Sequence, residues 1–473
     1  MLRVTSIAIV GGGPAGYEAA LVAAQLGAEV TLIEPDALGG ACVLYDCVPS
    51  KTLIATSETM TSFRGAPALG VRSPGGPDGE VSVDAAVVNR RVKDLAAWQS
   101  EDVWQRLSTE GVRMLAGRGR FAAEQPGRSR RVEVVDATGR VTETLDADVV
   151  LLATGATPRV LPGAVPDGDR ILTWRQVYDL TELPDHLVVV GSGVTGAEFA
   201  SAYLEMGVRV TLVSSRARVL PGEDTDAAEV IEEVFAEHGG EIVKRARAAS
   251  VVRTEKGVLV TMEDGRTVEG SHALMTVGSV PNTEGLALDA AGVALDERGF
   301  VRVDRVSRTA AAGVYAAGDC TGVLMLASVA AMQGRIAMWH ALGEAVLPLR
   351  LKTVSATVFT HPEIATVGIQ ENAIAAGEVP ARTVTMPLAS NARAKMQGLS
   401  DGFVKLFCRP ATGVVIGGVV VAPSASELIL PVAMAVQNRL TVTQIASTFA
   451  VYPSLSGSLT EAARRLMIHD DLD

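Results

Sequence analysis

Short apolar runs that end in glycine clusters mark the first part of the chain. The run Ser6–Val10 is followed by the glycine-rich segment Gly11–Gly16 and by an alanine-rich helical pattern over Tyr17–Leu26. A second apolar run, Glu29–Ile33, ends at the carboxylate of Glu34. A strand, a tight turn, a helix and a second strand in this order predict a β-α-β unit with parallel strands.

The same order of features returns further along the chain. Leu187–Val190 predicts a strand, Gly191–Gly196 a glycine turn, Ala197–Met206 a helix and Val208–Val213 the next strand. The chain is therefore expected to hold two similar units. Two further strands that lead into glycine-containing turns are expected at Val149–Ala153 and Gly313–Ala317.

The pattern changes past Gly343. Val358–Val367 and Val414–Val421 have the apolar character of buried strands, whereas Ala425–Asn438 and Leu459–Leu466 have helical periodicity. Strands and helices that do not alternate regularly are typical of an α+β domain, so a third domain is expected here.

Each glycine of the first turn has its own physical reason. Gly11 permits the tight turn, Gly13 lets a pyrophosphate approach the backbone, and Gly16 lets the helix pack on the strand. The helix N-terminus offers N–H donors and the positive end of its dipole to the phosphates. Glu34 is placed to accept hydrogen bonds from a ribose 2′-hydroxyl. The expected dinucleotide site comprises Gly11, Gly13, Pro14, Ala15, Gly16 and Glu34.

The second unit differs at the end of its second strand. Ser214 stands where the first unit has its acidic residue, and Ser215, Arg216 and Arg218 follow. Loss of the carboxylate beside guanidinium groups favours a 2′-phosphate, hence NADPH, with NADH as an alternative donor. The other interpretation is that these arginines are simply solvated loop residues. The expected second site comprises Gly191, Gly193, Thr195, Gly196, Ser214 and Ser215.

Composition limits the class of protein. At roughly 150 residues per domain, the 473 residues suggest three domains, and 48% hydrophobic residues allow several cores. The net charge of −12 argues against nucleic acid or an anionic membrane surface as the main partner. No apolar run reaches the roughly 18 to 20 residues that cross a bilayer, and Met1–Val10 lacks a secretory-leader pattern. We expect a cytoplasmic protein without a metal site.

Two of the four cysteines lie close together in the sequence. Cys42 and Cys47 are five residues apart, and four cysteines in a chain of this length do not form a disulfide scaffold. In a reducing compartment this spacing suggests redox chemistry. The alternative is that they are two unrelated small core residues.

Together these motifs resemble those of the flavoprotein disulfide reductases, the group that includes dihydrolipoamide dehydrogenase, glutathione reductase and mercuric reductase. Gly39–Lys51 is similar to the family's redox-disulfide segment, in which four residues separate the two cysteines. Ala153–Pro158 and Ala316–Asp319 are similar to its two linking motifs. The likeness covers essentially the whole length of the chain.

The resemblance implies FAD in the first site, a nicotinamide nucleotide in the second and a homodimer. Asp319 would bind the ribityl chain of FAD, and Lys51 and Glu198 would form an ion pair beside the flavin ring. With Cys42 and Cys47, that ion pair makes up the expected catalytic set. Further expected cofactor-binding residues are Gly40, Ala41, Thr154, Gly155, Gly278 and Gly318.

The expected fold is α/β, with two nested Rossmann-like dinucleotide-binding domains and a C-terminal α+β dimerisation domain. The FAD-binding domain is expected to be discontinuous because the second unit is inserted into it. We expect its first part at 1–155, the NAD(P)H-binding domain at 156–278, its second part at 279–347 and the dimerisation domain at 348–473.

The C-terminal motif departs from the family pattern. The disulfide reductases carry a His that shuttles protons and a Glu that orients it, whereas this chain has Tyr452 and Gly457. A phenol that titrates near 10 is a poor proton shuttle at neutral pH. Glu461 lies four residues beyond Gly457 but does not replace the imidazole. Asp46, next to Cys47, is also expected to raise the thiol pKa.

These departures resemble the actinobacterial lipoamide-dehydrogenase-like flavoproteins that act as NAD(P)H:quinone reductases. We therefore expect electrons to pass from NADPH or NADH through FAD to quinones or similar small acceptors. One alternative is a disulfide or metal-ion reductase that uses Cys42 and Cys47 without the usual base. Another is a structural or regulatory flavin-bearing dimer, against which the intact Lys51, Glu198 and Asp319 argue.

Overall fold

The computed structural model describes residues 4–72, 81–123 and 130–467 of the chain. The chain forms two compact units, each assembled from three separate stretches. The first contains 1–52, 89–159 and 278–350, and the second contains 53–88, 160–277 and 351–473.

A parallel five-stranded sheet forms the centre of the first unit. Its strand order is β18-β7-β1-β2-β3, so the strand that precedes the first glycine turn lies in the middle. The strands are β1 (Ser6–Val10), β2 (Glu29–Glu34), β3 (Arg113–Ala116), β7 (Val149–Leu152) and β18 (Val314–Ala316).

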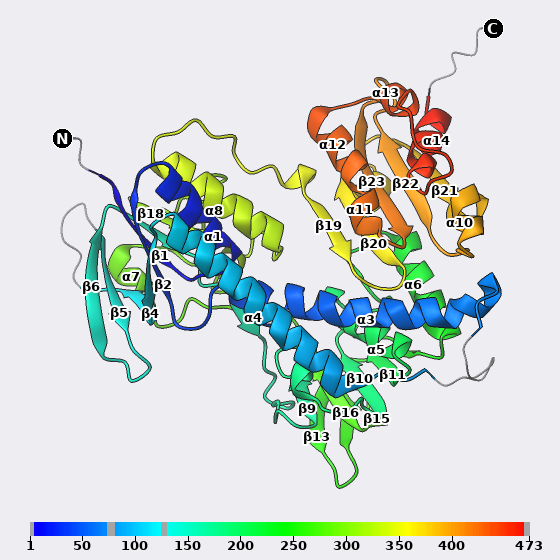
Figure 1. Ribbon diagram of the computed structural model, residues 1–473, viewed down its shortest axis with the longest axis horizontal. Coiled ribbons are helices and arrows are strands. Elements are labelled where there is room, and N and C mark those ends of the chain that lie inside the picture. Colours follow the sequence, from blue (N-terminus) through cyan, green and yellow to red (C-terminus); the bar gives the residue numbers. More distant parts are fainter. Residues whose placement is uncertain (1–3, 73–80, 124–129, 468–473) are drawn as a thin grey trace. The chain divides into compact units, whose positions relative to one another are not determined.

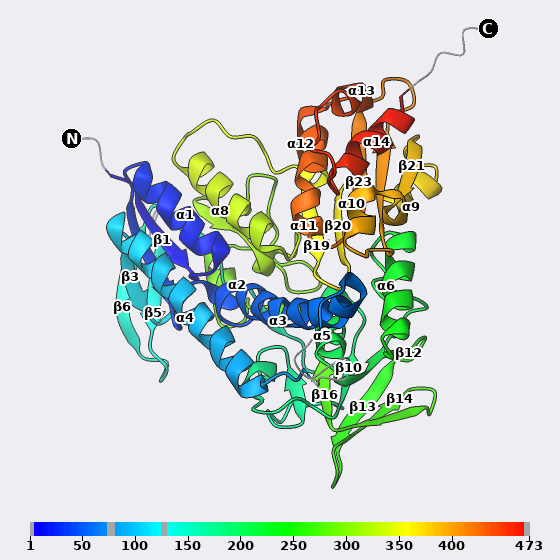
Figure 2. The same cartoon turned by 45° about the vertical axis from the view of Figure 1, so that its right-hand side comes forward.

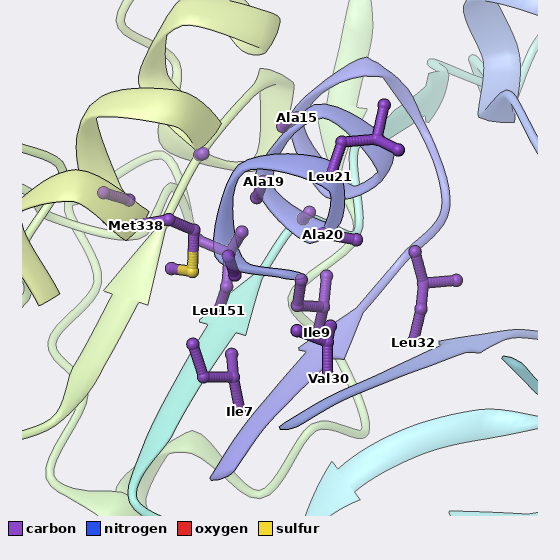
Figure 3. Packing of buried hydrophobic residues seen from close by; sticks show 14 of the residues in the cluster. Ile7, Ile9, Ala15, Ala19, Ala20, Leu21, Val30, Leu32, Leu151 and Met338 are labelled. Atoms are coloured by element: carbon purple, nitrogen blue, oxygen red, sulfur yellow. The ribbon is translucent and has the colours of Figure 1, made fainter. Parts of the chain in front are cut away.

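Two helices pack side by side on this sheet, α1 (Pro14–Gln25) and α8 (Ala327–Ala341) (Figures 1 and 2). Small side chains allow their close approach, because a Cβ added at Gly334 of α8 would lie 2.1 Å from the carbonyl oxygen of Ala15. Figure 3 shows the alanines of α1 above the isoleucines of β1.

The opposite side of the first sheet is covered by an antiparallel sheet and a short helix. Residues of both sheets share one buried cluster, which includes Val10, Phe121 and Val132. The covering elements are β4 (Arg118–Phe121), β5 (Arg130–Val135), β6 (Val141–Ala147) and α7 (Leu288–Ala291).

The second unit repeats this topology in its own parallel sheet, with strand order β12-β11-β10-β16-β9. The strand before the second glycine turn, β10, again lies in the middle. The strands are β9 (Ile171–Thr173), β10 (His186–Val190), β11 (Arg209–Val213), β12 (Glu241–Val243) and β16 (His272–Met275). The accompanying elements are α5 (Val194–Glu205), α6 (Thr225–Glu237), β13 (Ala248–Arg253), β14 (Val258–Met262) and β15 (Thr267–Gly270).

An antiparallel five-stranded sheet forms the rest of the second unit, with strand order β19-β20-β23-β22-β21. Helices α11, α12 and α14 pack against it around a common apolar cluster (Figure 1). The strands are β19 (Ser355–Val358), β20 (Glu363–Gly368), β21 (Arg382–Pro387), β22 (Phe403–Cys408) and β23 (Val415–Ala422). The helices are α9 (Glu371–Ala375), α10 (Ala392–Met396), α11 (Ala425–Leu428), α12 (Leu430–Asn438), α13 (Val442–Ala446) and α14 (Gly457–Arg465).

Two expected elements of the C-terminal region are wrong. The expected strand Val358–Val367 is two antiparallel strands, β19 and β20, joined by a turn that contains Pro362. The expected helix Ala425–Asn438 is interrupted at Ile429, because Pro431 lies in the first turn of the new helix α12 and has no N–H to continue the hydrogen bonds of α11.

Candidate cofactor and redox site

The first glycine loop has room for a ligand at only one of its three motif glycines. A Cβ at Gly11, which has φ of +109°, would lie 2.2 Å from the oxygen of Ala153. A Cβ at Gly16 would lie 1.8 Å from the oxygen of Gly11, whereas one at Gly13 would meet nothing closer than 3.8 Å. Gly11 and Gly16 are thus needed for close packing of the chain. The missing side chain of Gly13 leaves space for a ligand at the N-terminus of α1. This cradle fits a pyrophosphate.

Glu34 is tied to this loop by its side chain. The N–H of Gly12 donates to Oε2 at 2.6 Å, and the N–H of Asp36 donates to Oε1 at 3.1 Å. Burial raises the pKa of Glu34, while these two hydrogen bonds oppose the rise. Each oxygen still has a lone pair for a ribose hydroxyl.

A cavity of about 730 Å³ adjoins Glu34 and is large enough for a nucleoside. One of its walls comes from α4 (Ala85–Thr109), a helix in which sequence analysis placed no binding residue. No nucleotide motif marks that helix, so only the fold reveals its contribution. The lining includes Leu32, Glu34, Asp36 and Leu38 near β2, Met114 and Ala116 in β3, and Lys93, Ser100 and Trp104 in α4.

The second loop has the same geometry as the first. Gly191 has φ of +115°, and its Cβ would lie 2.3 Å from the oxygen of Thr276. A Cβ at Gly196 would lie 1.9 Å from the oxygen of Gly191, whereas one at Gly193 would have no neighbour within 4 Å. Thr195 lies half-buried in the first turn of α5. The second loop therefore also fits a pyrophosphate.

Ser214 takes the place in the second unit that Glu34 has in the first. It is buried at the end of β11, and its Oγ lies 2.7 Å from Oγ of Ser192. Ser215 and Arg216 are exposed. Arg218 is half-buried, and its buried Nε has no hydrogen-bond partner within the part of the chain that the structure describes. Arg218 is therefore not simply a solvated loop residue.

The cysteine-bearing segment lies against the first glycine loop. The N–H of Gly39 donates to the oxygen of Gly12 at 2.9 Å. A Cβ at Gly40, which begins α2 (Gly40–Leu44), would lie 2.7 Å from Cα of Gly13. Ala41 follows in the same helix, while Pro14 and Ala15 form the first turn of α1.

The two linking segments of the first unit are also brought together. Thr154 Oγ1 donates to the oxygen of Asn282 at 2.7 Å, and Asn282 Nδ2 donates to the oxygen of Thr154 at 2.9 Å. Strands β8 (Ala156–Pro158) and β17 (Ser279–Pro281) pair in antiparallel fashion. Gly155 directly precedes β8, and Gly278 directly precedes β17. These contacts place both expected cofactor-binding segments side by side.

Asp319 follows Gly318, whose φ is +80°. Burial, together with the negative charge of Asp46, raises the pKa of Asp319 to about 6. Asp319 is therefore near enough to the cysteine segment for the two carboxylates to interact. The first unit thus gathers Gly318 and Asp319 with Gly40 and the first glycine loop.

Cys42 and Cys47 are hydrogen-bonded free thiols, and both are half-buried. Cys47 begins α3 (Cys47–Gly65), and Cys42 lies in α2. Their mutual hydrogen bond lowers the pKa of Cys42 and raises that of Cys47, to which burial also contributes. The negative charge of Asp46 acts against thiolate formation at both sulfurs. The pair is close enough for dithiol chemistry, with Cys42 the more readily ionised thiol and Cys47 disfavoured as a nucleophile.

Asp46→Asn is expected to make these thiols more reactive. Removing the negative charge should lower both thiol pKa values, so the alkylation rate should rise at lower pH. Iodoacetamide labelling of the reduced protein between pH 6 and 9 should show a rate about 2- to 10-fold higher at pH 7. Asp36→Asn, a charge change outside the cysteine segment, is the control. Unchanged alkylation in Asp46→Asn would contradict the electrostatic role.

Lys51 and Glu198 belong to different units, so their expected pairing stays a prediction. Glu198 is buried in α5, where its Oε1 accepts a 3.0 Å hydrogen bond from the N–H of Phe359. The N–H of His361 donates to Oγ of Ser201 at 2.9 Å. The turn after β19 thus holds the helix that carries Glu198.

The C-terminal motif has no acid–base pair in the structure. Tyr452 is 85% exposed. Gly457 begins α14, and its N–H donates to Oγ of Ser454 at 3.1 Å. Glu461 binds Arg464, and these hydrogen bonds, supported by Arg465, lower the pKa of Glu461 to about 2. Glu461 is therefore engaged locally as a structural carboxylate.

Family models match nearly the whole of this arrangement. The model for pyridine nucleotide-disulphide oxidoreductase matches residues 5–334, and that for the dimerisation domain of the same family matches residues 354–463. The chain belongs to the pyridine nucleotide-disulphide oxidoreductase family. Its resemblance to the flavoprotein disulfide reductases and its α/β fold class are thereby confirmed. Members use FAD and NAD(P)H, and both glycine loops fit the pyrophosphate of such a dinucleotide.

Relatives in this family carry two different names. An NAD(P)H dehydrogenase (quinone) of Mycobacterium tuberculosis is 63% identical, covering 99% of this chain and 95% of the relative. A dihydrolipoyl dehydrogenase of Chlorobaculum tepidum is 34% identical, covering 97% and 96%. The crystal structure of LpdA from Mycobacterium tuberculosis has a TM-score of 0.93 at 62% identity, covering 98% of this chain and 100% of that one.

Family membership also makes the chain an oxidoreductase with a dimerisation domain. Among the described residues, no helix is long and apolar enough to cross a membrane.

Proposed function

We propose that this flavoprotein is an NAD(P)H:quinone oxidoreductase that passes electrons from NADPH through FAD to a quinone. The observation that carries the proposal is the combination of two pyrophosphate cradles with a C-terminal motif that lacks its acid–base pair. Hydride transfer from a nicotinamide needs positioning, and both glycine loops can provide it. Efficient dithiol interchange needs a proton shuttle, which Tyr452 does not provide at neutral pH.

The roles of the chain's own residues follow from this reaction. When bound, FAD supplies the group that accepts a hydride and gives up electrons to a second substrate. The first loop, Glu34 and Asp319 hold FAD, while the second loop holds the nicotinamide nucleotide. We assign Lys51 and Glu198 to orienting the reacting rings. Thr154, Gly155, Gly278 and Gly318 shape the backbone around the cofactor.

The residues that follow β11 favour NADPH over NADH as the electron donor. The buried hydroxyl of Ser214 replaces the carboxylate that would bind a ribose 2′-hydroxyl and repel a 2′-phosphate. Arg216 is exposed next to it, and Arg218 has an unpartnered buried Nε within the described residues. The 63% identical relative is named for both nucleotides and for a quinone, which supports both the donor and the acceptor.

We also propose that the active form is a cytoplasmic homodimer. The dimerisation domain supports a second copy as the partner. Phe449, Val451 and Tyr452 are largely exposed apolar or aromatic residues of this domain, as expected for a face that a partner covers. Four cysteines in 473 residues, too few for a disulfide scaffold, are compatible with a reducing compartment.

Steady-state oxidation of NADPH by the FAD-loaded protein tests the proposed function. A simple benzoquinone should support rapid turnover, and lipoamide should support almost none. A dihydrolipoyl dehydrogenase assayed in parallel gives the opposite preference and controls the lipoamide reagent. Efficient lipoamide turnover by this protein would replace the proposal with a disulfide reductase.

Changing both Cys42→Ser and Cys47→Ser is expected to leave quinone reduction within about twofold of the original protein, because the flavin route uses no thiol. The measurement is kcat/KM for the quinone at saturating NADPH. The matched control is Cys408→Ser, a buried cysteine of β22. Loss of most quinone turnover in the double variant alone would show that electrons pass through the cysteine pair.

Disulfide reduction is the second candidate function, because the two thiols lie within hydrogen-bonding distance of each other. Relatives named dihydrolipoyl dehydrogenase support it at lower identity. The cysteine variant separates the two activities, since disulfide reduction requires both sulfurs whereas the flavin route to a quinone does not.

A further inference from the structure

The loop after β12 brings a second group of basic residues to the nucleotide-binding edge. Lys244, Arg245 and Arg247 follow Val243, the last residue of β12. Strands β10, β11 and β12 are neighbours and parallel, so their carboxyl ends meet at the same edge. Dinucleotides bind at this edge in parallel sheets.

Main-chain hydrogen bonds fix this loop beside the serine that replaces the acidic residue. The N–H of Ala246 donates to the oxygen of Ser214 at 2.8 Å, and the N–H of Arg245 donates to the oxygen of Arg216 at 2.9 Å. Ser214 is in turn bonded to Ser192 of the glycine loop at 2.7 Å. Arg245 therefore belongs to the same local structure as the expected 2′-phosphate site.

The neighbouring cations have carboxylate partners. Lys244 Nζ lies 2.5 Å from Glu232 Oε2, and Arg247 Nε lies 3.9 Å from Glu263 Oε2. Within the part of the chain that the structure describes, no ion pair or side-chain hydrogen bond engages the exposed guanidinium group of Arg245 or that of Arg216. Two uncompensated positive charges thus lie on adjacent segments.

The backbone at Arg245 is held in an unusual conformation. Its φ is +52°, in the left-handed region that side-chain-bearing residues rarely adopt. Arg266 braces the loop, because its Nη2 donates to the oxygen of Arg245 at 2.9 Å while Asp264 holds the same guanidinium at 2.7 Å. Strained backbone of this kind is concentrated at ligand clamps. The brace fixes the point from which the Arg245 side chain leaves the loop.

We infer that Arg245 is a specificity-determining residue that, together with Arg216, binds the 2′-phosphate of NADPH. Two guanidinium groups on adjacent segments match the charge and the planar hydrogen-bonding preference of a phosphate monoester. NADH lacks that phosphate, so Arg245 does not increase the affinity for NADH. The inference rests on the proposed use of NADPH but not on the identity of the electron acceptor.

Flavin reduction without any acceptor tests this role directly. Stopped-flow bleaching of the bound flavin by NADPH should need about 10-fold more nucleotide in Arg245→Gln, because a charge-assisted phosphate contact is lost. The same variant should respond to NADH within about twofold of the original protein. Calorimetry should show about 10-fold weaker binding of 2′,5′-ADP, with 5′-AMP binding unchanged.

Two matched variants keep the test specific. Arg247→Gln removes the same charge from the same loop and should leave both nucleotides unaffected, whereas Arg245→Lys should retain part of the NADPH preference. Equal losses with NADPH and NADH, or no loss with either, would overturn the inference. So would an original protein that binds 2′,5′-ADP no more tightly than 5′-AMP. A failure of quinone turnover with normal flavin reduction would instead contradict only the proposed acceptor.

Discussion

Gly193→Val is expected to raise the NADPH concentration needed for half-maximal flavin reduction by at least about 100-fold, while FAD stays bound. Gly193 has φ of −75° and ψ of −173°, which valine also adopts, and its Cβ would meet no atom within 4 Å. The added side chain would therefore leave the fold intact. It would occupy the open space at the N-terminus of α5, where the pyrophosphate needs to approach the backbone.

The measurement is stopped-flow flavin bleaching, with the flavin spectrum confirming that the protein is loaded. Gly196→Val is the matched control, because its Cβ would lie 1.9 Å from the oxygen of Gly191 and should destabilise the fold itself. Its thermal unfolding midpoint should drop, whereas that of Gly193→Val should not. If NADPH reduced the flavin of Gly193→Val normally, the second glycine loop would not be the binding site of the nucleotide.

Combining Tyr452→His with Gly457→Glu is expected to raise lipoamide reduction by about 10²- to 10⁴-fold, the usual contribution of general acid–base catalysis. Tyr452 is exposed, so an imidazole fits at its position. A Cβ at Gly457 would lie 3.5 Å from Oγ of Ser454, an ordinary contact. The new glutamate is needed because Glu461 is already bound to Arg464.

The comparison is between the double variant, each single variant and the original protein, with lipoamide and a quinone as acceptors. Tyr452→His alone should gain less, because nothing orients the new imidazole. Quinone turnover should change little in any variant. If the double variant gains no lipoamide activity, the block lies elsewhere, and adding Asp46→Asn tests whether thiol electrostatics impose it.

Local patterning was enough to predict the two β-α-β units. Strand, glycine turn and helix follow each other within about 20 residues, so the chemistry of Gly11 or Gly191 is coupled to its neighbours in sequence. The elements of the C-terminal region were harder to predict, because an apolar run does not show where the chain reverses its direction. Val358–Val367 reads as one strand, yet Pro362 lies in the turn between two.

In the candidate site, too, some residues could be predicted from local sequence and others could not. The glycines, Glu34, Ser214 and the cysteine pair were predictable because fixed spacing carries their chemistry. Trp104 of α4 and Arg245 in the loop after β12 were not. Helix α4 forms a cavity wall far along the chain from Glu34, and parallel pairing of β11 with β12 brings Arg245 to the second site. Pairing of Lys51 with Glu198 stays a prediction based on resemblance.

The hydrogen bond from the N–H of Phe359 to Glu198 connects the dimerisation domain to α5, the helix that follows the second glycine loop. A fragment that ends before β19 would lose this hydrogen bond to a carboxylate, a contribution of about 1 to 3 kcal/mol, together with the contacts between β19 and α5. The domains of this chain are therefore poor units for recombination.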